Sequence, residues 1–261
     1  MTAIPQAIPT KELEDQVGVF LGTFYNKRIE ALNDLQLANV LKRKNPYLYR
    51  AITSGAASDI VEELLRARIS SSDETIFGND FFEPLAKWVA EQAYKHDSSV
   101  NTRTSSGSGV DVEIEFTDRI MMIAVKSGTS VFNAQSLAKQ RLQFNEARNR
   151  LSKLRKTFDP VVGYSYGRKN SKEPDFRELV GQAFWEELSG DPDFYLRLVA
   201  AMEKWSLEHA VVFKAEYDKA VNRFTKELLN EFADSEGQLD WRKIVTFNSS
   251  RNTPRLHKGK Q

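Results

Sequence analysis

Hydrophobic and polar positions change their period along the chain, from a helical period at both ends to a strand-like period in the middle. Near both ends apolar residues recur at spacings of mostly three and four, which predicts amphipathic helices with one buried face. Gly78 and Pro84 indicate a break or a fresh start near Glu83, because proline is best tolerated in the first turn of a helix. The expected helices cover residues 10–36, 54–69, about 78–95, 134–156 and, in two pieces, 177 to about 233.

The middle of the chain shows the period of two that is typical of strands. Residues 110–116 (VDVEIEF) alternate strictly, with the acidic residues on one face and the apolar residues, from Val110 on, on the other. Residues 119–126 (RIMMIAVK) form a nearly continuous apolar run that ends in a lone lysine, which indicates a central, buried strand. With further strands expected at 99–104 and 161–167, we predict one compact α/β domain with helical additions at both ends.

A short turn at residues 117–118 joins two of these strands into a hairpin. If the residues that flank the turn pair with each other, Asp111 faces Ala124, and Lys126 lies one step beyond on the same face. Asp111 and Lys126 then emerge near the same end of neighbouring strands. A carboxylate and an ammonium group in this arrangement suit metal-assisted phosphodiester hydrolysis. The carboxylate would hold Mg²⁺, and the lysine would orient the attacking water or stabilise developing charge.

The composition excludes several kinds of site. The 261 residues include no cysteine and only three scattered histidines, so a disulfide scaffold, a cysteine zinc site, an iron–sulfur site and a cysteine nucleophile are excluded. No phosphate-loop or dinucleotide motif is present, and we expect no small organic cofactor. The N-terminus does not resemble a signal peptide, and no apolar run approaches the ~20 residues that span a bilayer. We therefore expect a cytoplasmic protein with no membrane partner.

Basic residues are unevenly distributed, although the formal net charge is only +1. Residues 139–156 contain seven lysines and arginines and one acid, and LKRK at 41–44 and the tail at 249–261 add more. Such a run is either a solvated helix face or a phosphate-binding surface. Arginine is also the side chain that most often contacts guanine bases. The candidates for DNA contact are Lys139, Arg141, Arg148, Arg168 and Lys169.

The order of elements resembles a known nuclease core. The helix, three strands, helix and strand between about 78 and 167 resemble the αβββαβ core of the PD-(D/E)xK nuclease superfamily, with Asp111 at the first acidic position and Lys126 at the lysine position. A longer ordered series, from about residue 35 to 250, is similar to a group of bacterial type II restriction endonucleases. It consists of LKRKNPYLYRA, SSSDETIFGNDFFE, GVDVEIEF, IAVKSG with Asn133 following, GYSYGR, GQAFWEELSG and LDWRKIVTFNSS.

This resemblance implies a restriction-endonuclease-like fold and a Mg²⁺-dependent enzyme that cuts both strands of a specific duplex DNA site, leaving 5′-phosphates. It further implies host defence against foreign DNA, a cognate methyltransferase and a homodimer whose symmetry matches the site. The alternative is a catalytically inactive or structure-specific DNA-binding protein on the same fold. The expected single domain of 1–261 consists of a helical part at 1–75, a catalytic core at 76–167, a second helical part at 168–248 and a basic tail at 249–261.

The chain departs from the superfamily pattern at Ala124, where a second acidic ligand is expected, because alanine offers no side-chain oxygen. Some superfamily members carry this carboxylate on a neighbouring helix, which makes Glu83 the candidate. Glu113, one same-face step from Asp111, is the alternative, and it is equally well explained as an exposed strand residue. The main-chain carbonyl of Val125 is a further candidate ligand. The expected metal ligands are Asp111, Glu83 and Val125, and the expected catalytic set is Asp111, Lys126, Glu83 and Glu113.

Overall fold

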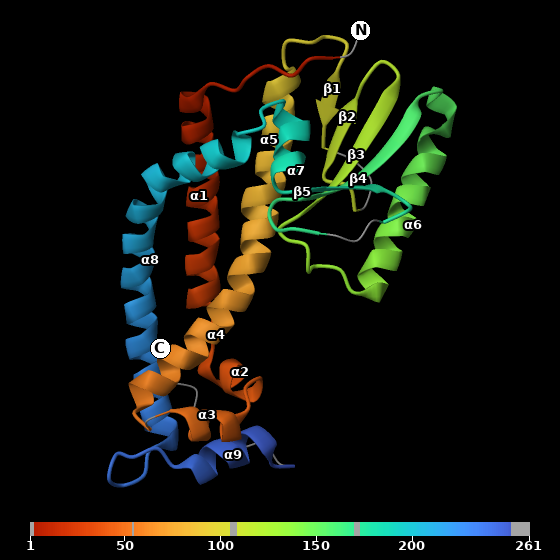
Figure 1. The fold of residues 1–261 in the computed structure, drawn as a ribbon. Helices are drawn as coiled ribbons and strands as arrows, with labels where there is room; N and C mark the ends of the chain where they lie inside the picture. Colours follow the sequence, from red (N-terminus) through yellow and green to blue (C-terminus); the bar gives the residue numbers. More distant parts are fainter. Residues whose placement is uncertain (1–2, 54, 105–108, 170–172, 252–261) are drawn as a thin grey trace. The chain divides into compact units, whose positions relative to one another are not determined.

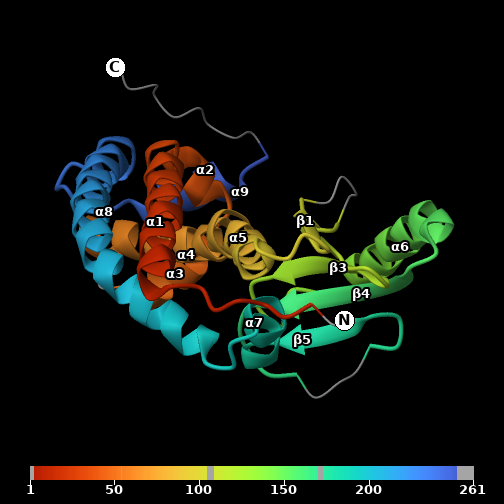
Figure 2. The same cartoon turned by 90° about the horizontal axis from the view of Figure 1, so that it is seen from above.

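The computed structural model contains a five-stranded mixed sheet in the order β1-β2-β3-β4-β5 (Figure 1). The first three strands are antiparallel neighbours, whereas β3, β4 and β5 run parallel. Figure 2 shows β1, β3, β4 and β5 in this order from above. The strands are β1 (Asn101–Arg103), β2 (Val112–Glu115), β3 (Arg119–Lys126), β4 (Thr157–Tyr164) and β5 (Arg177–Val180). The residues described are 3–53, 55–104, 109–169 and 173–251.

Helices precede, interrupt and follow the strands. A π-helical turn (Gly78–Phe82) connects α4 to α5, and a 3₁₀ turn (Ser152–Leu154) follows α6. The helices are α1 (Thr10–Asn33), α2 (Leu37–Lys42), α3 (Pro46–Ile52), α4 (Ala57–Phe77), α5 (Glu83–Tyr94), α6 (Ala134–Leu151), α7 (Gln182–Ser189), α8 (Phe194–Phe232) and α9 (Trp241–Ser249). None of the helices within the described ranges has the length and apolar character needed to cross a membrane.

The chain divides into two units, each with its own core. The sheet unit comprises residues 1–24 and 76–207, and the helical unit comprises residues 25–75 and 208–261. The expected catalytic core at 76–167 lies within the sheet unit, whereas the helical parts expected before and after it are each divided between the units. The assignment of one domain stays a prediction. The expected tail lies outside the described residues from 252 on.

The sheet is buried on both faces, with α5 on one side and α6 on the other (Figure 1). Along β3, Met121 and Ile123 pack with Leu85 of α5, whereas Met122 packs with Phe144 of α6. Successive side chains of a strand point to opposite faces, so a strand buried on both faces needs apolar residues at every position. This explains the continuous apolar run of β3, whose six interior residues are all buried.

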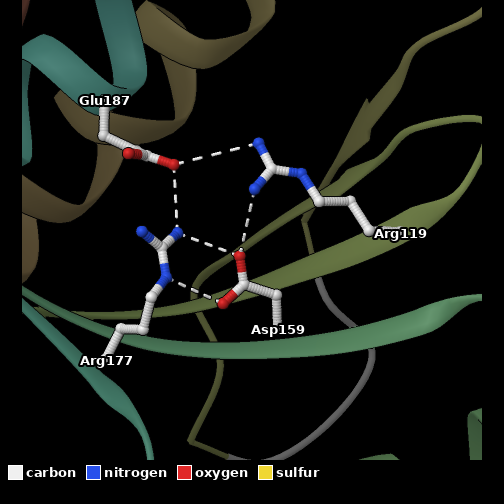
Figure 3. Close-up of polar contacts among 4 residues, drawn as sticks. All are labelled: Arg119, Asp159, Arg177 and Glu187. Carbon is white, nitrogen blue, oxygen red and sulfur yellow. Dashed lines mark hydrogen bonds and ion pairs between the residues drawn. The ribbon is translucent and has the colours of Figure 1, made fainter. Parts of the chain in front are cut away.

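The ends of three strands furthest from Lys126 are joined by an ion-pair network (Figure 3). Arg177 of β5 donates to both oxygens of Asp159 in β4, at 2.9 Å each, and at 3.0 Å to Glu187 of α7. Arg119, the first residue of β3, lies 3.4 Å from Asp159 and 3.9 Å from Glu187. The network thus ties β3, β4, β5 and α7 together at the end of β3 opposite to Lys126.

The observed elements confirm the α/β class and the expected core of helix, three strands, helix and strand. The expected fresh start near Glu83 is confirmed, since α5 begins at that residue. The backbone is not broken there, however, because it stays helical from α4 through the π turn into α5. We attribute this to the wide π turn, which accommodates a proline that lacks an N–H group at the second position of α5.

Two expectations are wrong. Residues 177–180 form the edge strand β5 instead of a helix, and Gly181, with a φ of 55°, separates this strand from α7. A four-residue segment is too short for its period to distinguish the two states. The strict alternation also fails at Val110, which packs in the core beside α6, whereas Val112 packs in the core beside α5. The regular strand begins only at Val112, after Asp111.

Candidate active site

The hairpin that carries the candidate residues has the register expected from its turn. Val112 pairs with Ile123 and Glu115 pairs with Ile120. Asp111 lies directly before β2, and its main-chain N–H donates to the carbonyl oxygen of Ile123 at 2.8 Å. Asp111 is therefore held at the end of the sheet where β3 finishes.

Asp111 and Lys126 lie side by side at this end. The Nζ atom of Lys126 is 4.0 Å from Oδ2 of Asp111, and it donates a hydrogen bond of 2.9 Å to the carbonyl oxygen of Val125. The N–H of Val125 donates to the same Asp111 oxygen at 2.7 Å, which fixes the carboxylate. Each of the two charged side chains is 24% exposed, so solvent reaches both. The expected proximity is confirmed, and the catalytic role stays a prediction.

Glu83, the first residue of α5, belongs to the same group. Burial is the main reason that its pKa rises to about 7; the carboxylates of Asp111 and Asp80 raise it further, and Lys126 opposes them. Burial also raises the pKa of Asp111, whereas Lys126 and the N–H of Val125 lower it. The effect of Asp111 on the pKa of Glu83 indicates that these two carboxylates are neighbours, as expected for a carboxylate displaced to the preceding helix.

The π turn before Glu83 packs beside the end of β3. A Cβ atom on Gly78 would lie 3.7 Å from the side chain of Ser127, the residue that follows Lys126. Phe81, in the same turn, is fully buried and stacks on Phe77 with ring centroids 4.5 Å apart. The start of α5 is therefore anchored next to Lys126, although residues 83 and 126 are far apart in the chain.

The donor set suits a hard cation that keeps part of its water shell. Within the described ranges, no three histidine or acidic side chains are grouped to hold a metal. Two carboxylates, from Asp111 and Glu83, and the carbonyl oxygen of Val125 are nevertheless all oxygen donors at one partly exposed place. Mg²⁺ commonly uses one or two carboxylates and completes its octahedron with water and substrate phosphates. The residues present therefore fit Mg²⁺.

Glu113 has a different neighbour from the other candidates. Its side chain is buried, and the guanidinium of Arg103 in β1 donates to its Oε1 atom from two nitrogens, Nε at 2.9 Å. Of the two alternatives left open for Glu113, the exposed strand residue is wrong, because the pairing of β1 with β2 places Arg103 directly opposite Glu113. The structure pairs Glu113 with Arg103 and does not pair it with Lys126; its role as a ligand stays untested.

Gln140 supports the segment that carries Asp111 and was not singled out from the sequence. Its side chain is buried on α6, and Nε2 donates to the carbonyl oxygen of Gly109 at 2.8 Å. Gly109 has a φ of 76°, and a Cβ atom there would lie 2.0 Å from the side chain of Gln143. Gln140 shares the buried face of its helix with Phe144 and Ala147. A polar residue in that stripe is the signal that could have identified it.

The five candidates for DNA contact fall into two groups. Lys139, Arg148 and Arg168 are exposed. Arg141 is held by carboxylates of Glu173 at 2.6 Å and Asp175 at 3.0 Å. Lys169 forms an ion pair with the buried carboxylate of Glu178, to which Tyr164 also donates at 2.8 Å. The first three cations are therefore accessible to phosphate, whereas Arg141 and Lys169 would have to exchange a carboxylate for it.

Comparison with known protein families gives a match over most of the chain. No curated protein matches the chain. The family described as type II restriction endonuclease EcoO109I matches residues 11–210, a range that includes the whole sheet and the group formed by Glu83, Asp111, Val125 and Lys126. A mixed sheet flanked by helices is also the restriction-endonuclease-like fold expected for such a protein. The chain belongs to the type II restriction endonuclease EcoO109I family and is thus related to nucleases that act on DNA.

Proposed function

We propose that this protein is a Mg²⁺-dependent type II restriction endonuclease, which hydrolyses both strands of a specific duplex DNA site and serves in host defence against foreign DNA. The observation that supports this most is the meeting of Asp111, Lys126 and Glu83 at one end of the sheet. The membership of the chain in a restriction endonuclease family supports DNA as the class of substrate. The group requires no small organic cofactor.

Asp111, Glu83 and the carbonyl oxygen of Val125 would hold Mg²⁺, whose contribution when bound is to neutralise phosphate charge and favour ionisation of a water. Asp111 is oriented for this by the N–H of Val125. Two partly buried carboxylates that repel each other are stabilised in their charged forms by a nearby cation, because each raises the free energy of the other's charged form. Mg²⁺ affinity should therefore depend on both.

Lys126 is the residue that we assign to orienting water and stabilising charge on the phosphate. An ammonium group has three N–H donors, and one is directed to Val125, so two remain for water and a phosphate oxygen. In the hydrolysis, a water oxygen bonds to phosphorus, the bond from phosphorus to O3′ breaks, and O3′ takes a proton while the water loses one to solvent. The products are a 5′-phosphate and a 3′-hydroxyl.

The exposed cations Lys139, Arg148 and Arg168 are the first candidates for contacts to the DNA backbone. Arg141 and Lys169 would contact it only after exchanging their carboxylate partners for phosphate. Cleavage of two strands with one catalytic group per chain favours a homodimer, whose two-fold axis would coincide with that of a symmetric site. Each protomer would then cut one strand.

The second candidate function is a DNA-binding protein on the same fold that has no nuclease activity, and Ala124 at the usual acidic position favours it. Incubating the protein with a long duplex, with and without Mg²⁺, separates the two. Discrete Mg²⁺-dependent fragments support restriction, smearing supports a non-specific nuclease, and intact DNA with a gel shift supports the binding protein. Lys126→Ala should abolish cleavage, whereas Lys87→Ala, which removes a lysine of α5 paired with Glu91, should cut normally.

A further inference from the structure

Charge is sorted within the helical unit. Its described residues, 25–53, 55–75 and 208–251, contain fifteen lysines and arginines and fifteen acidic residues, so the unit as a whole is neutral. Residues 37–52 and 240–251, however, contain seven basic residues and one aspartate, a net charge of +6. The remaining described residues of the unit contain eight basic and fourteen acidic residues, a net charge of −6. We call residues 37–52 and 240–251 the α2–α3–α9 surface.

The two segments of this surface are packed together (Figure 1). The side-chain amide of Asn248 in α9 donates to the carbonyl oxygens of Leu41 at 2.8 Å and Lys44 at 3.2 Å, which holds the turn between α2 and α3. Asn45 caps α3 by accepting from the N–H groups of Tyr47 and Leu48. The basic residues therefore project from a defined framework instead of a loose chain.

The cations of the surface form no ion pairs with carboxylates of the described residues. Across the part of the helical unit that the structure describes, none of the seven forms an ion pair within 4.0 Å, and all but Lys44 are exposed. The one aspartate, Asp240, is used as the N-cap of α9. The seven are Lys42, Arg43, Lys44, Arg50, Arg242, Lys243 and Arg251.

At least half of the eight other cations in the described part of the helical unit, in contrast, form ion pairs with carboxylates. Arg28 forms an ion pair with Asp73 at 2.7 Å, and Lys214 and Lys219 of α8 contact acidic residues of their own helix at 2.6 and 2.7 Å. A cluster of like charges that repel one another is retained at a cost in stability, and a polyanion that binds there relieves that cost. The contrast indicates a surface suited to an external anion.

We infer that the α2–α3–α9 surface binds the phosphate backbone of duplex DNA, as a contact area in addition to the catalytic end of the sheet. The inference rests on the proposed action on DNA, and charge complementarity selects this partner, since duplex DNA presents closely spaced phosphates. Tyr47, Leu48 and Ile52 of α3, which are 65%, 51% and 61% exposed, add apolar contact area beside the cations. Contacts of this kind position DNA without reading its sequence.

The test measures binding of a random-sequence 30-base-pair duplex in the presence of EDTA. Fluorescence anisotropy gives the affinity over a range of salt concentrations. The variant carries Arg43→Gln, Arg50→Gln and Arg242→Gln. The matched control carries Lys214→Gln, Lys219→Gln and Lys226→Gln, which removes the same charge from exposed positions of α8 in the same unit. Circular dichroism and thermal unfolding establish that both triple variants are folded.

We expect the surface variant to lose about tenfold or more in affinity. The plot of log affinity against log salt has a negative slope, and we expect its magnitude to decrease by about two to three, because each lost phosphate contact removes about 0.9 from it. The control should bind within about twofold of the wild type. Equal losses in both triple variants would show that net charge alone matters and would overturn the inference. So would unchanged DNA binding, or a change in self-association alone, measured by sedimentation.

The same proteins, assayed with Mg²⁺, keep this inference apart from the proposed function. A wild type that binds DNA through this surface but does not cut would refute the nuclease activity and leave the surface intact. A wild type that cuts, together with a surface variant whose salt slope is unchanged, would refute the surface and leave the nuclease.

Discussion

Replacing Glu83 by glutamine should stabilise the metal-free protein at pH 8 and change its stability little below pH 5. The pKa of Glu83 rises from 4.5 to about 7 in the folded protein, chiefly through burial. Between these two values the folded state holds a proton that the unfolded state has lost, so the stability that Glu83 contributes is complete below pH 4.5 and is lost as pH rises through 7. Glutamine carries no charge and avoids that loss.

The size of the effect follows from the same displacement. A change in pKa from 4.5 to about 7 corresponds to about 3 kcal/mol if it acts on stability in full. Glu83 is only half-buried, and solvent screening reduces the expected gain of Glu83→Gln at pH 8 to about 1–2 kcal/mol. The gain should fall to near zero at pH 4.5, where glutamate and glutamine are both neutral in the folded protein.

The assay is urea unfolding in EDTA between pH 4.5 and 8.5, with Glu146→Gln, at an exposed position of α6, as the matched control. The difference between Glu83→Gln and the wild type should grow with pH, and that of the control should stay constant. Added Mg²⁺ should then stabilise the wild type more than Glu83→Gln, because a ligand that binds only the folded state stabilises it more the more tightly it binds. A Glu83→Gln difference that is the same at pH 5 and pH 8 would refute the proposed environment of this residue.

Three other substitutions test separate parts of the account. Asp111→Asn should bind DNA normally but cut about a hundredfold more slowly or worse, and normal single-turnover cleavage would contradict its role. Gln140→Leu should destabilise the protein by about 1–3 kcal/mol and raise the Mg²⁺ concentration needed for half-maximal cleavage, since it leaves the carbonyl of Gly109 unpaired. The control Gln135→Leu, at an exposed position in the first turn of the same helix, should have neither effect. Asp159→Asn should lower the free energy of unfolding, measured in urea, by about 1–3 kcal/mol, because the two arginines that Asp159 bridges lose a partner. The Mg²⁺ concentration needed for cleavage should stay unchanged, and a change in it would show that the network acts on the site.

The hairpin could be predicted from the sequence because its information is local. The turn at 117–118 sets which residues face each other, and a period of two then places every later pair. The proximity of Asp111 and Lys126 follows from these two rules, and the observed pairing of Val112 with Ile123 agrees with it. The start of α6 is equally local, since the side chain of Asn133 and the hydroxyl of Ser136 cap each other's N–H groups.

Features that depend on distant segments could not be predicted in the same way. The neighbour of Glu113 is Arg103, which is brought there by the pairing of β1 with β2, and the intervening loop gives no sign of it. The position of Glu83 depends on a π turn, and hydrophobic periodicity does not distinguish such a turn from a helix break. Its assignment as the displaced carboxylate came from family resemblance, and its closeness to Asp111 emerged from the packing of α5 on the sheet.

Sequencing of DNA ends tests the central claim most directly. A long duplex of mixed sequence is incubated with the wild type or with Lys126→Ala, with and without Mg²⁺, and the new ends are ligated and read. We predict ends that carry 5′-phosphates and fall at one recurring sequence, formed only by the wild type and only with Mg²⁺. Ends scattered over unrelated sequences, or the same ends formed by Lys126→Ala, would contradict the claim that this site performs specific DNA cleavage.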